Sequence, residues 1–353
     1  MTIGLLIVLA LIFILPFTFH FIEHNLEYFL LVMGVSAVII SRTLSLDLIL
    51  HIFENYLLYF ITAAVLIAGL VFRISVKKIK TFVNYATVQV PLTLFIFLLI
   101  VILGLVSSLI TAIVASLVLV EIVHALPFNH KQKVTLTIIA CFSIGLGAAL
   151  TPIGEPLATI VASSLKVDFL YLLRTIGIYV VPCIITLGLL GALYIGRTYN
   201  AQKSDLEIEE KKERVLEDQN IAEIESLYDV FIRALKIFLF VIALELLGAG
   251  FKPLINTYVI HLDSRILYWI NMCSAVLDNA TIAAAEVSPA MSLQQIQAIL
   301  MGLLLSGGML IPGNIPNIIS AGKLNIKSRE WAKVGIPLGL ILLLIYFAVI
   351  FII

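Results

Sequence analysis

The sequence predicts an all-α polytopic membrane protein, built as an inverted-topology repeat with two re-entrant helical hairpins and two broken helices. Three observations predict this fold. Hydrophobic residues make up 61% of the 353 residues and charged residues only 12%, whereas an ordinary soluble domain carries roughly 25% charged residues. The long apolar runs do not alternate in polarity, which disfavours an outer-membrane barrel. Two of these runs are interrupted by paired prolines with a glycine between them.

The charge balance of the chain gives no indication of a nucleic-acid partner. The chain has 22 basic and 22 acidic residues, and it has no basic tail, so no nucleic-acid partner is expected. The cysteines Cys141, Cys183 and Cys273 lie singly in apolar runs, which favours small core residues over a disulfide or a metal site. The first run, 3–19, lacks a basic leader and a small-residue cleavage motif, so it is interpreted as a first membrane helix.

The N-terminal part contains three predicted spans. The runs 3–19 and 26–40 are short, but each is long enough to cross most of the hydrocarbon layer as a helix. The segment 44–54 is interpreted as an interfacial linker, and 56–72 is the third span. Four basic residues follow it and mark the cytoplasmic side under the positive-inside rule: Arg73, Lys77, Lys78 and Lys80.

The next apolar stretch, 90–126, is too long for one tilted span and short for two. Ser107, Ser108 and Thr111 lie near its centre. This predicts a helical hairpin with a polar tip that enters and leaves the membrane on one side. A second basic cluster, at 130–133, places both ends of the hairpin on the cytoplasmic side.

A broken helix is predicted over 134–165. Proline lacks an N–H donor and clashes with the preceding turn, so Pro152 and Pro156 interrupt the helix together with Gly154. A carboxylate, Glu155, lies inside this break. The run 169–196 is a full span. The hydrophilic segment 198–229 predicts a solvated amphipathic helix that joins two halves of the chain.

The second half repeats the same order of elements. A span at 230–247 precedes a hairpin at 264–287, and a broken helix at 293–320 precedes the last span, 334–353. The second break contains Pro312, Gly313 and Pro316. The flanks of the second hairpin are poor in basic residues, which places them outside. The two halves are therefore predicted to have inverted topologies, with the N-terminus outside.

The four interruptions are predicted to converge, with each hairpin tip facing the break of its own half. They carry oxygen-bearing side chains and no Lys or Arg, which favours a cation as ligand, since hard cations take carboxylate, amide, hydroxyl and carbonyl oxygens. A buried carboxylate can also take up a proton, because burial disfavours its charged form. The candidate ion-binding residues are Ser108, Thr111, Thr151, Glu155, Asp278, Asn279, Thr281, Asn314 and Asn317.

Acidic residues within membrane segments are costly and are functional by default. Asp278 and Glu155 are therefore the predicted Na⁺ sites. Glu121 and Glu286 lie in the second limbs of their hairpins, where either a proton-linked role or a structural hydrogen bond fits. Glu245, near the end of a span, is more readily explained as structural. The glycine pairs 145/147 and 307/308 are expected to allow close helix packing.

These motifs together resemble the ion transporter superfamily, which includes NhaD-type sodium/proton antiporters, arsenite permeases and sodium–dicarboxylate symporters. The segment Thr151–Pro156 is similar to the corresponding break of the symporters. The segments Leu277–Thr281 and Pro312–Asn317 look closer to the NhaD-type antiporters. The compact length most resembles a prokaryotic branch of predicted cation transporters.

The resemblance implies a scaffold and a mobile transport domain that moves as an elevator, in a homodimer in the cell (inner or plasma) membrane. The scaffold then comprises 1–80, 167–250 with its linker at 198–229, and the C-terminal span 323–353. The transport domain comprises 81–166 and 251–322. The chain departs from the symporters, because their Ser-Asn-Thr tip motif is missing and Glu155 stands where they have a neutral residue.

The expected function is a secondary active Na⁺/H⁺, or related monovalent cation/proton, antiporter, with membrane lipid, Na⁺ and H⁺ as partners. No cofactor is expected besides Na⁺ as the coupling or transported ion. A sodium-coupled symporter of a carboxylate or oxyanion is the alternative. An intramembrane enzyme is disfavoured because the sequence has no zinc motif and no Gly-x-Ser-x-Gly elbow. A channel is also disfavoured, because occluded hairpins suit alternating access better than an open pore.

Overall fold

A computed structural model of the chain describes residues 1–23, 25–55, 90–202, 227–254, 257–258, 261–275 and 279–352, with short pieces between 58 and 70. Within these ranges every regular element is a helix, which confirms the predicted all-α class. The basic cluster at 73–80, most of the third span and most of the 198–229 linker lie outside the described residues. Asp278 lies outside them too, and so does the side chain of Thr281.

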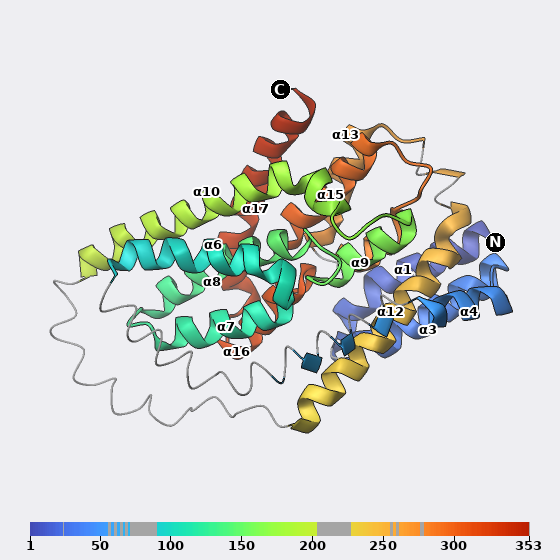
Figure 1. Cartoon of the computed structure of the whole chain (residues 1–353), viewed down its shortest axis with the longest axis horizontal. Coiled ribbons are helices and arrows are strands. Elements are labelled where there is room, and N and C mark those ends of the chain that lie inside the picture. The colour runs from blue at the N-terminus through green and yellow to red at the C-terminus, as the bar shows by residue number, and fades with distance from the viewer. Residues whose placement is uncertain are drawn as a thin grey trace.

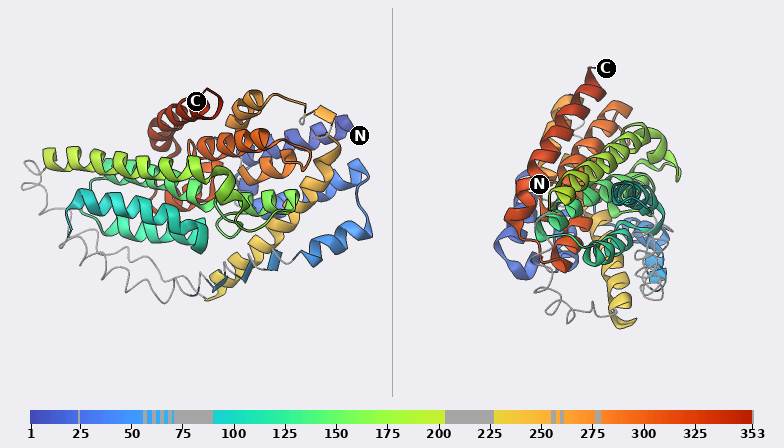
Figure 2. Two further views of the ribbon diagram at one scale, coloured as in Figure 1. Left: turned by 45° about the horizontal axis from the view of Figure 1, so that its top comes forward. Right: turned by 90° about the vertical axis from the view of Figure 1, so that its left-hand side faces the viewer.

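The N-terminal helices pack with one long helix from the middle of the chain. They are α1 (Thr2–Thr18), α2 (His20–Glu23), α3 (Leu26–Ser41) and α4 (Leu46–Glu54). Helix α3 lies along α12 (Leu227–Leu254), on the side of the molecule away from α6 and α10 (Figures 1 and 2). The segment predicted as an interfacial linker is therefore largely helical. The Ser45 hydroxyl starts α4 by accepting from the Leu48 N–H at 3.1 Å.

The first half contains the predicted hairpin and broken helix. Helices α6 (Leu92–Ile110) and α7 (Ala112–Ala125) are joined through Thr111 alone and run back along each other (Figure 1). A capping box between Asn129 and Gln132 starts α8 (His130–Ala148). The chain then leaves the helix and resumes it as α9 (Pro156–Leu165), so the break lies where the prolines predict it.

The second half has a matching order. Its hairpin begins with α13 (Ser264–Ile270) and the 3₁₀ turn η3 (Asn271–Ala275), and returns as α14 (Asn279–Glu286). Its broken helix and final helix follow, as α15 (Leu293–Gly307), η4 (Ile311–Gly313), α16 (Ile315–Lys323) and α17 (Ser328–Phe351). Helix α10 (Tyr171–Gln202) precedes the central linker. Arg329 and Lys333 lie in the first turns of α17.

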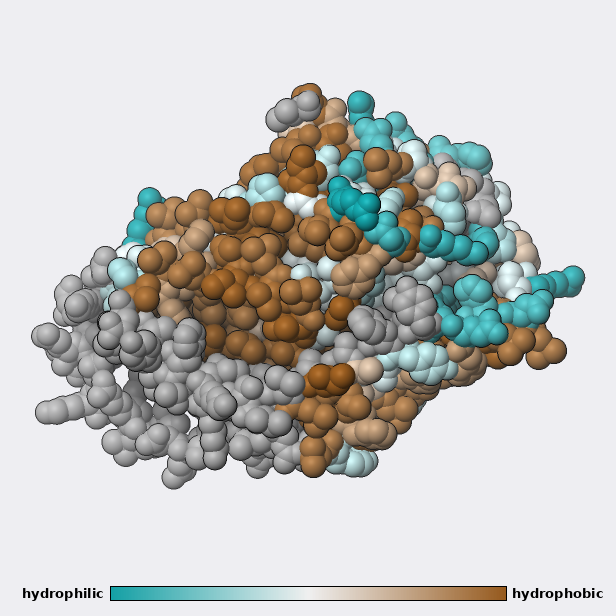
Figure 3. Space-filling view, in the orientation of Figure 1, coloured by the Kyte–Doolittle hydropathy of each residue, from teal (hydrophilic) through white to brown (hydrophobic). Residues whose placement is uncertain are grey.

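Three of the described helices are long and apolar enough to cross a membrane: Leu92–Ile110, Tyr171–Tyr199 and Ser328–Phe351. Large apolar side chains on these helices remain exposed, among them Ile102 on α6, Ile178 on α10 and Leu344 on α17. Figure 3 shows the broad hydrophobic surface on one face of the molecule. Such exposed apolar surface is typical of a helical membrane protein.

The two halves interlock. Helix α16 of the second half packs against α7 of the first, and α9 of the first half packs against α14 of the second. Ile315 and Ile319 of α16 pack on a buried cluster that includes Val114 and Leu117 of α7. Two of the glycines predicted to allow close helix packing do so. An ideal Cβ on Gly147 would lie 1.7 Å from the Gly104 carbonyl oxygen, and one on Gly308 would lie 2.4 Å from the Phe142 ring.

The loops at one end of the helices are tied to each other by side chains. His130 at the start of α8 contacts Glu330 at the start of α17, with 3.0 Å between Nε2 and Oε1. The Gln132 amide donates to the Thr198 hydroxyl near the end of α10 at 3.2 Å. The start of α8 belongs to the basic cluster predicted on the cytoplasmic side, and these contacts join it to the start of α17 and the end of α10.

Candidate functional site

The first hairpin tip contacts the break of its own half, as predicted. The Ala112 N–H, just after the tip, donates to the Gly154 carbonyl in the break at 2.7 Å. In the other direction, the Thr151 hydroxyl donates to the Ser108 carbonyl at the end of α6. The interrupted helices leave the carbonyls of Gly154 and Ser108 without helical partners, and these two hydrogen bonds supply them. The tip and the break therefore form one folded unit.

The second hairpin and the second break are packed just as closely. An ideal Cβ on Gly313 would lie 2.5 Å from the Gly307 carbonyl oxygen and 2.6 Å from that of Ser274. The amide of Asn317 closes the break, because its Nδ2 donates to the carbonyls of Gly307 at 2.9 Å and Leu310 at 2.8 Å. Asn317 is thus a structural element of the break as well as a candidate ligand.

The two breaks have the same backbone geometry. The Gly154 N–H donates to the Thr151 carbonyl at 3.1 Å, and the Gly313 N–H donates to the Leu310 carbonyl at 3.3 Å. The next residue in each break is the N-cap of the following helix. These N-caps are Glu155 (φ −153°, ψ 160°) before α9 and Asn314 (φ −156°, ψ 148°) before α16. A carboxylate in the first half therefore corresponds to an amide in the second.

The contacts between hairpin and broken helix also correspond. The Ser107 hydroxyl of α6 donates to the Ile144 carbonyl of α8 at 2.9 Å. The Ser274 hydroxyl of η3 donates to the Leu303 carbonyl of α15 at 3.2 Å. Ser107 and Ser274 occupy matching places before the two tips. The similarity of the halves thus extends to single hydrogen bonds across the packed helices.

The described candidate residues are all buried. The exposed fraction is at most 8% for each of Ser108, Thr111, Thr151, Glu155, Asn279, Asn314 and Asn317. The two halves meet at Asn314, because an ideal Cβ on Gly145 of α8 would lie 2.2 Å from the Asn314 Nδ2. A larger residue at position 145 would force the Asn314 amide to move.

Some buried polar atoms at the second break have no hydrogen-bond partner among the described residues: Oδ1 of Asn314, Oδ1 of Asn317 and Nδ2 of Asn279. An unpaired buried polar group costs about 1–3 kcal/mol, so such groups call for an unseen ligand, ion or water. Amide oxygens are suitable ligands for a hard cation. The second break therefore presents two of them.

Other candidates have a different role or lie elsewhere. The Ser108 hydroxyl donates to the Leu105 carbonyl of its own helix at 2.7 Å. The Thr151 hydroxyl donates to the Ser108 carbonyl. Both hydroxyls therefore have structural roles.

Glu121 is half-buried on α7. Glu286 is buried at the end of α14 and is hydrogen-bonded by Asn271. Asn271 is not among the residues predicted from the sequence, where its only signal is an amide in an apolar limb.

Thr111 has a strained backbone at the first tip, with φ 74° and ψ 149°. Glycine alone adopts this region readily, and a β-branched residue there costs about 1–3 kcal/mol. We expect Thr111→Gly to raise the thermal unfolding temperature, since glycine caps a helix almost as well as threonine. Thr111→Val keeps the strain, loses the capping contact to the Val114 N–H, and should unfold at a lower temperature than the parent. Thermal unfolding of the purified proteins checks both, and equal midpoints would contradict the strain.

The search of curated proteins finds no match to the chain. A family profile, however, matches nearly the whole sequence, including both hairpins and both breaks. The chain belongs to the family described as protein of unknown function (DUF1646), which it matches over residues 2–353.

Proposed function

We propose that the protein is a secondary active transporter of the cell membrane that exchanges Na⁺, or a related monovalent cation, for H⁺. The observation that carries the proposal is the paired break geometry, which buries the Glu155 carboxylate in one half and the Asn314 amide at the equivalent place in the other. Broken helices in corresponding places of two halves are the best indicator of a transporter's binding site.

The chemistry of the breaks supports a cation as cargo. Among the described residues, the breaks and tips contain a carboxylate, amides and hydroxyls but no Lys or Arg. Asp278 directly precedes Asn279 in the sequence and is proposed as the second carboxylate. Na⁺ and H⁺ would compete for these carboxylates, and this competition alone suffices to couple their movements in opposite directions.

The mechanism that we propose is alternating access. The matching contacts of the two halves support an inverted-topology repeat, in which hairpins and broken helices form the mobile unit. The scaffold would comprise the N-terminal helices, α10, α12 and α17, and two copies of the chain would pair through it. This elevator arrangement follows from the family resemblance and the interlocked packing, and it requires the interface between the two units to slide.

One observation favours a second candidate, a sodium-coupled anion symporter. The Asn314 side chain makes no capping hydrogen bond to α16. The N–H groups of Asn317 and Ile318 already donate to the Asn314 carbonyl, so it is the positive end of the helix dipole, rather than a set of free N–H groups, that would favour an anionic ligand there. In this alternative the carboxylates serve Na⁺ alone, and a carboxylate or oxyanion lies at the second break.

The two functions are separated by proton flux in proteoliposomes that contain a pH-sensitive dye. For the antiporter, we expect an imposed Na⁺ gradient to drive protons in the opposite direction with no organic substrate present, well above protein-free vesicles. Li⁺ and K⁺ gradients then define the cation selectivity. If the internal pH changes only when a carboxylate or oxyanion is supplied with Na⁺, the symporter is correct and the exchange proposal fails.

A further inference from the structure

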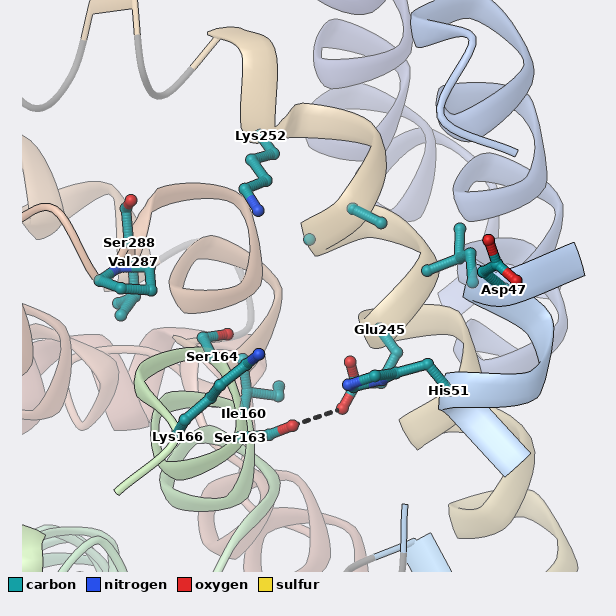
Figure 4. A pocket seen from close by; sticks show the side chains of 14 residues that line it. Asp47, His51, Ile160, Ser163, Ser164, Lys166, Glu245, Lys252, Val287 and Ser288 are labelled. Carbon is teal, nitrogen blue, oxygen red and sulfur yellow. Dashed lines mark hydrogen bonds between the residues drawn. The ribbon is translucent and has the colours of Figure 1, made fainter. Parts of the chain in front are cut away.

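A cleft of about 590 Å³ separates the N-terminal helices from the end of the first broken helix. Helices α4 and α12 form one wall, and the end of α9 with the segment after α14 forms the other (Figure 4). Charged side chains line it from both walls, namely Asp47, His51, Lys166, Glu245 and Lys252. The segments around it are those predicted to lie on the outer side of the membrane.

Three polar side chains from three elements meet at this cleft. Oε1 of Glu245, on α12, accepts hydrogen bonds from the Ser163 hydroxyl of α9 at 2.9 Å and from the Asn55 amide, just after α4, at 3.0 Å. The Asn55 Nδ2 and the Ser163 Oγ are themselves 3.2 Å apart. All three side chains are half-buried. Ser163 and Glu245 belong to the cleft lining.

Among the described residues, the two side chains that donate to Glu245 are neutral, and His51 in the same cleft forms no ion pair with it, so its negative charge is stabilised but not neutralised. Lys166 and Lys252 line the same cleft, but within the described residues neither forms an ion pair with this carboxylate. Glu245 lies in an otherwise apolar stretch of α12. A carboxylate held by an amide and a hydroxyl in such surroundings is a suitable site for a small cation, which would supply the missing charge.

We infer that Glu245, Ser163 and Asn55 form an outer site that binds a small monovalent cation before it reaches the breaks. The carboxylate and the hydroxyl oxygen are ligands as they stand. The amide of Asn55 supplies its oxygen after a half-turn about its terminal bond, an orientation that hydrogen bonding alone assigns. Ser163 and Glu155 lie on one helix, about 12 Å apart at 1.5 Å per residue. The inference rests on the proposed function, because it gives the cation a position on the way to Glu155.

Transport kinetics test this inference. We expect Glu245→Gln to raise the Na⁺ concentration for half-maximal proton flux about tenfold and to leave the maximal rate unchanged, because an outer site affects capture and not turnover. Asp47→Asn is the matched control, since it removes an equal charge from the same cleft without touching the three residues, and it should change neither value. An unchanged half-maximal concentration with an altered maximal rate would show a structural contact only and would overturn the inference.

Equilibrium binding keeps the test independent of transport. Radioactive Na⁺ should still bind purified Glu155→Gln/Asp278→Asn protein, in which both proposed central carboxylates are neutral, and adding Glu245→Gln to these two changes should abolish this binding. Binding that survives in the triple variant, or that is absent from the double variant, refutes the outer site. If this Na⁺ binding is seen but the parent protein does not exchange Na⁺ for protons, the proposed function fails and the outer site stands.

Discussion

Replacing Glu155 with glutamine is expected to abolish Na⁺-driven proton flux while the protein still folds. The side chain is 3% exposed and lies at the N-cap of α9, inside the first break. Glutamine has nearly the same shape but carries no charge and cannot exchange a proton. Removing the charged partner of a buried cation costs about 3 kcal/mol of binding free energy. This cost corresponds to roughly a 100-fold loss of cation affinity.

Proteoliposome flux, with expression and thermal unfolding measured in parallel, checks this expectation. Asp168→Asn is the control, because Asp168 is an exposed carboxylate just before α10 that pairs with Arg174 in the first turn of this helix. The flux of this variant should remain at the parent rate. The same loss is expected for Asp278→Asn on the sequence argument. Parent-like flux in Glu155→Gln would remove the first break from the exchange mechanism.

Replacing Gly147 with alanine should produce the largest loss of stability in the transport region. The new Cβ would lie 1.7 Å from the Gly104 carbonyl oxygen, well inside van der Waals contact. Because the obstacle is backbone, no side-chain rotation relieves it, and α6 and α8 must separate. We expect a cost of about 3 kcal/mol or more, the upper range for overpacking of a core, seen as a lower thermal unfolding midpoint.

Gly322→Ala provides the matched comparison for this prediction. Gly322 is helical and exposed in α16, and an added Cβ meets nothing within 4 Å. Alanine there should leave the midpoint unchanged or raise it, because it favours a helix by about 1 kcal/mol over glycine. Equal midpoints for the two alanine variants would show that α6 and α8 can part without cost.

The sequence was sufficient to locate both breaks but not to align them. Proline removes an N–H and clashes with the preceding turn wherever it stands, so the interruptions could be predicted. Matching the prolines pairs Pro152 with Pro312, whereas the hydrogen bonds pair Gly154 with Gly313. The alignment depends on which carbonyl accepts across the break, and a pattern of residue types does not carry that information.

Two features of the site were beyond prediction for different reasons. Thr111 has no intrinsic preference for positive φ, and only glycine, asparagine or aspartate would have signalled such a turn. Glu245 stands out in the sequence as a lone acid, but its partners Asn55 and Ser163 are distant in sequence. Periodicity reports the face of a helix and says nothing of which distant helix lies against it.

The crossed packing of the two halves has a consequence for biosynthesis. When translation reaches the central linker, α7 and α9 are complete, but the helices that they pack against, α16 and α14, have not yet been made. The first hairpin therefore waits in the translocon or lipid without its final neighbour until residue 323 has emerged. Membrane insertion of the first half is therefore expected to precede its final packing, which α14 and α16 complete.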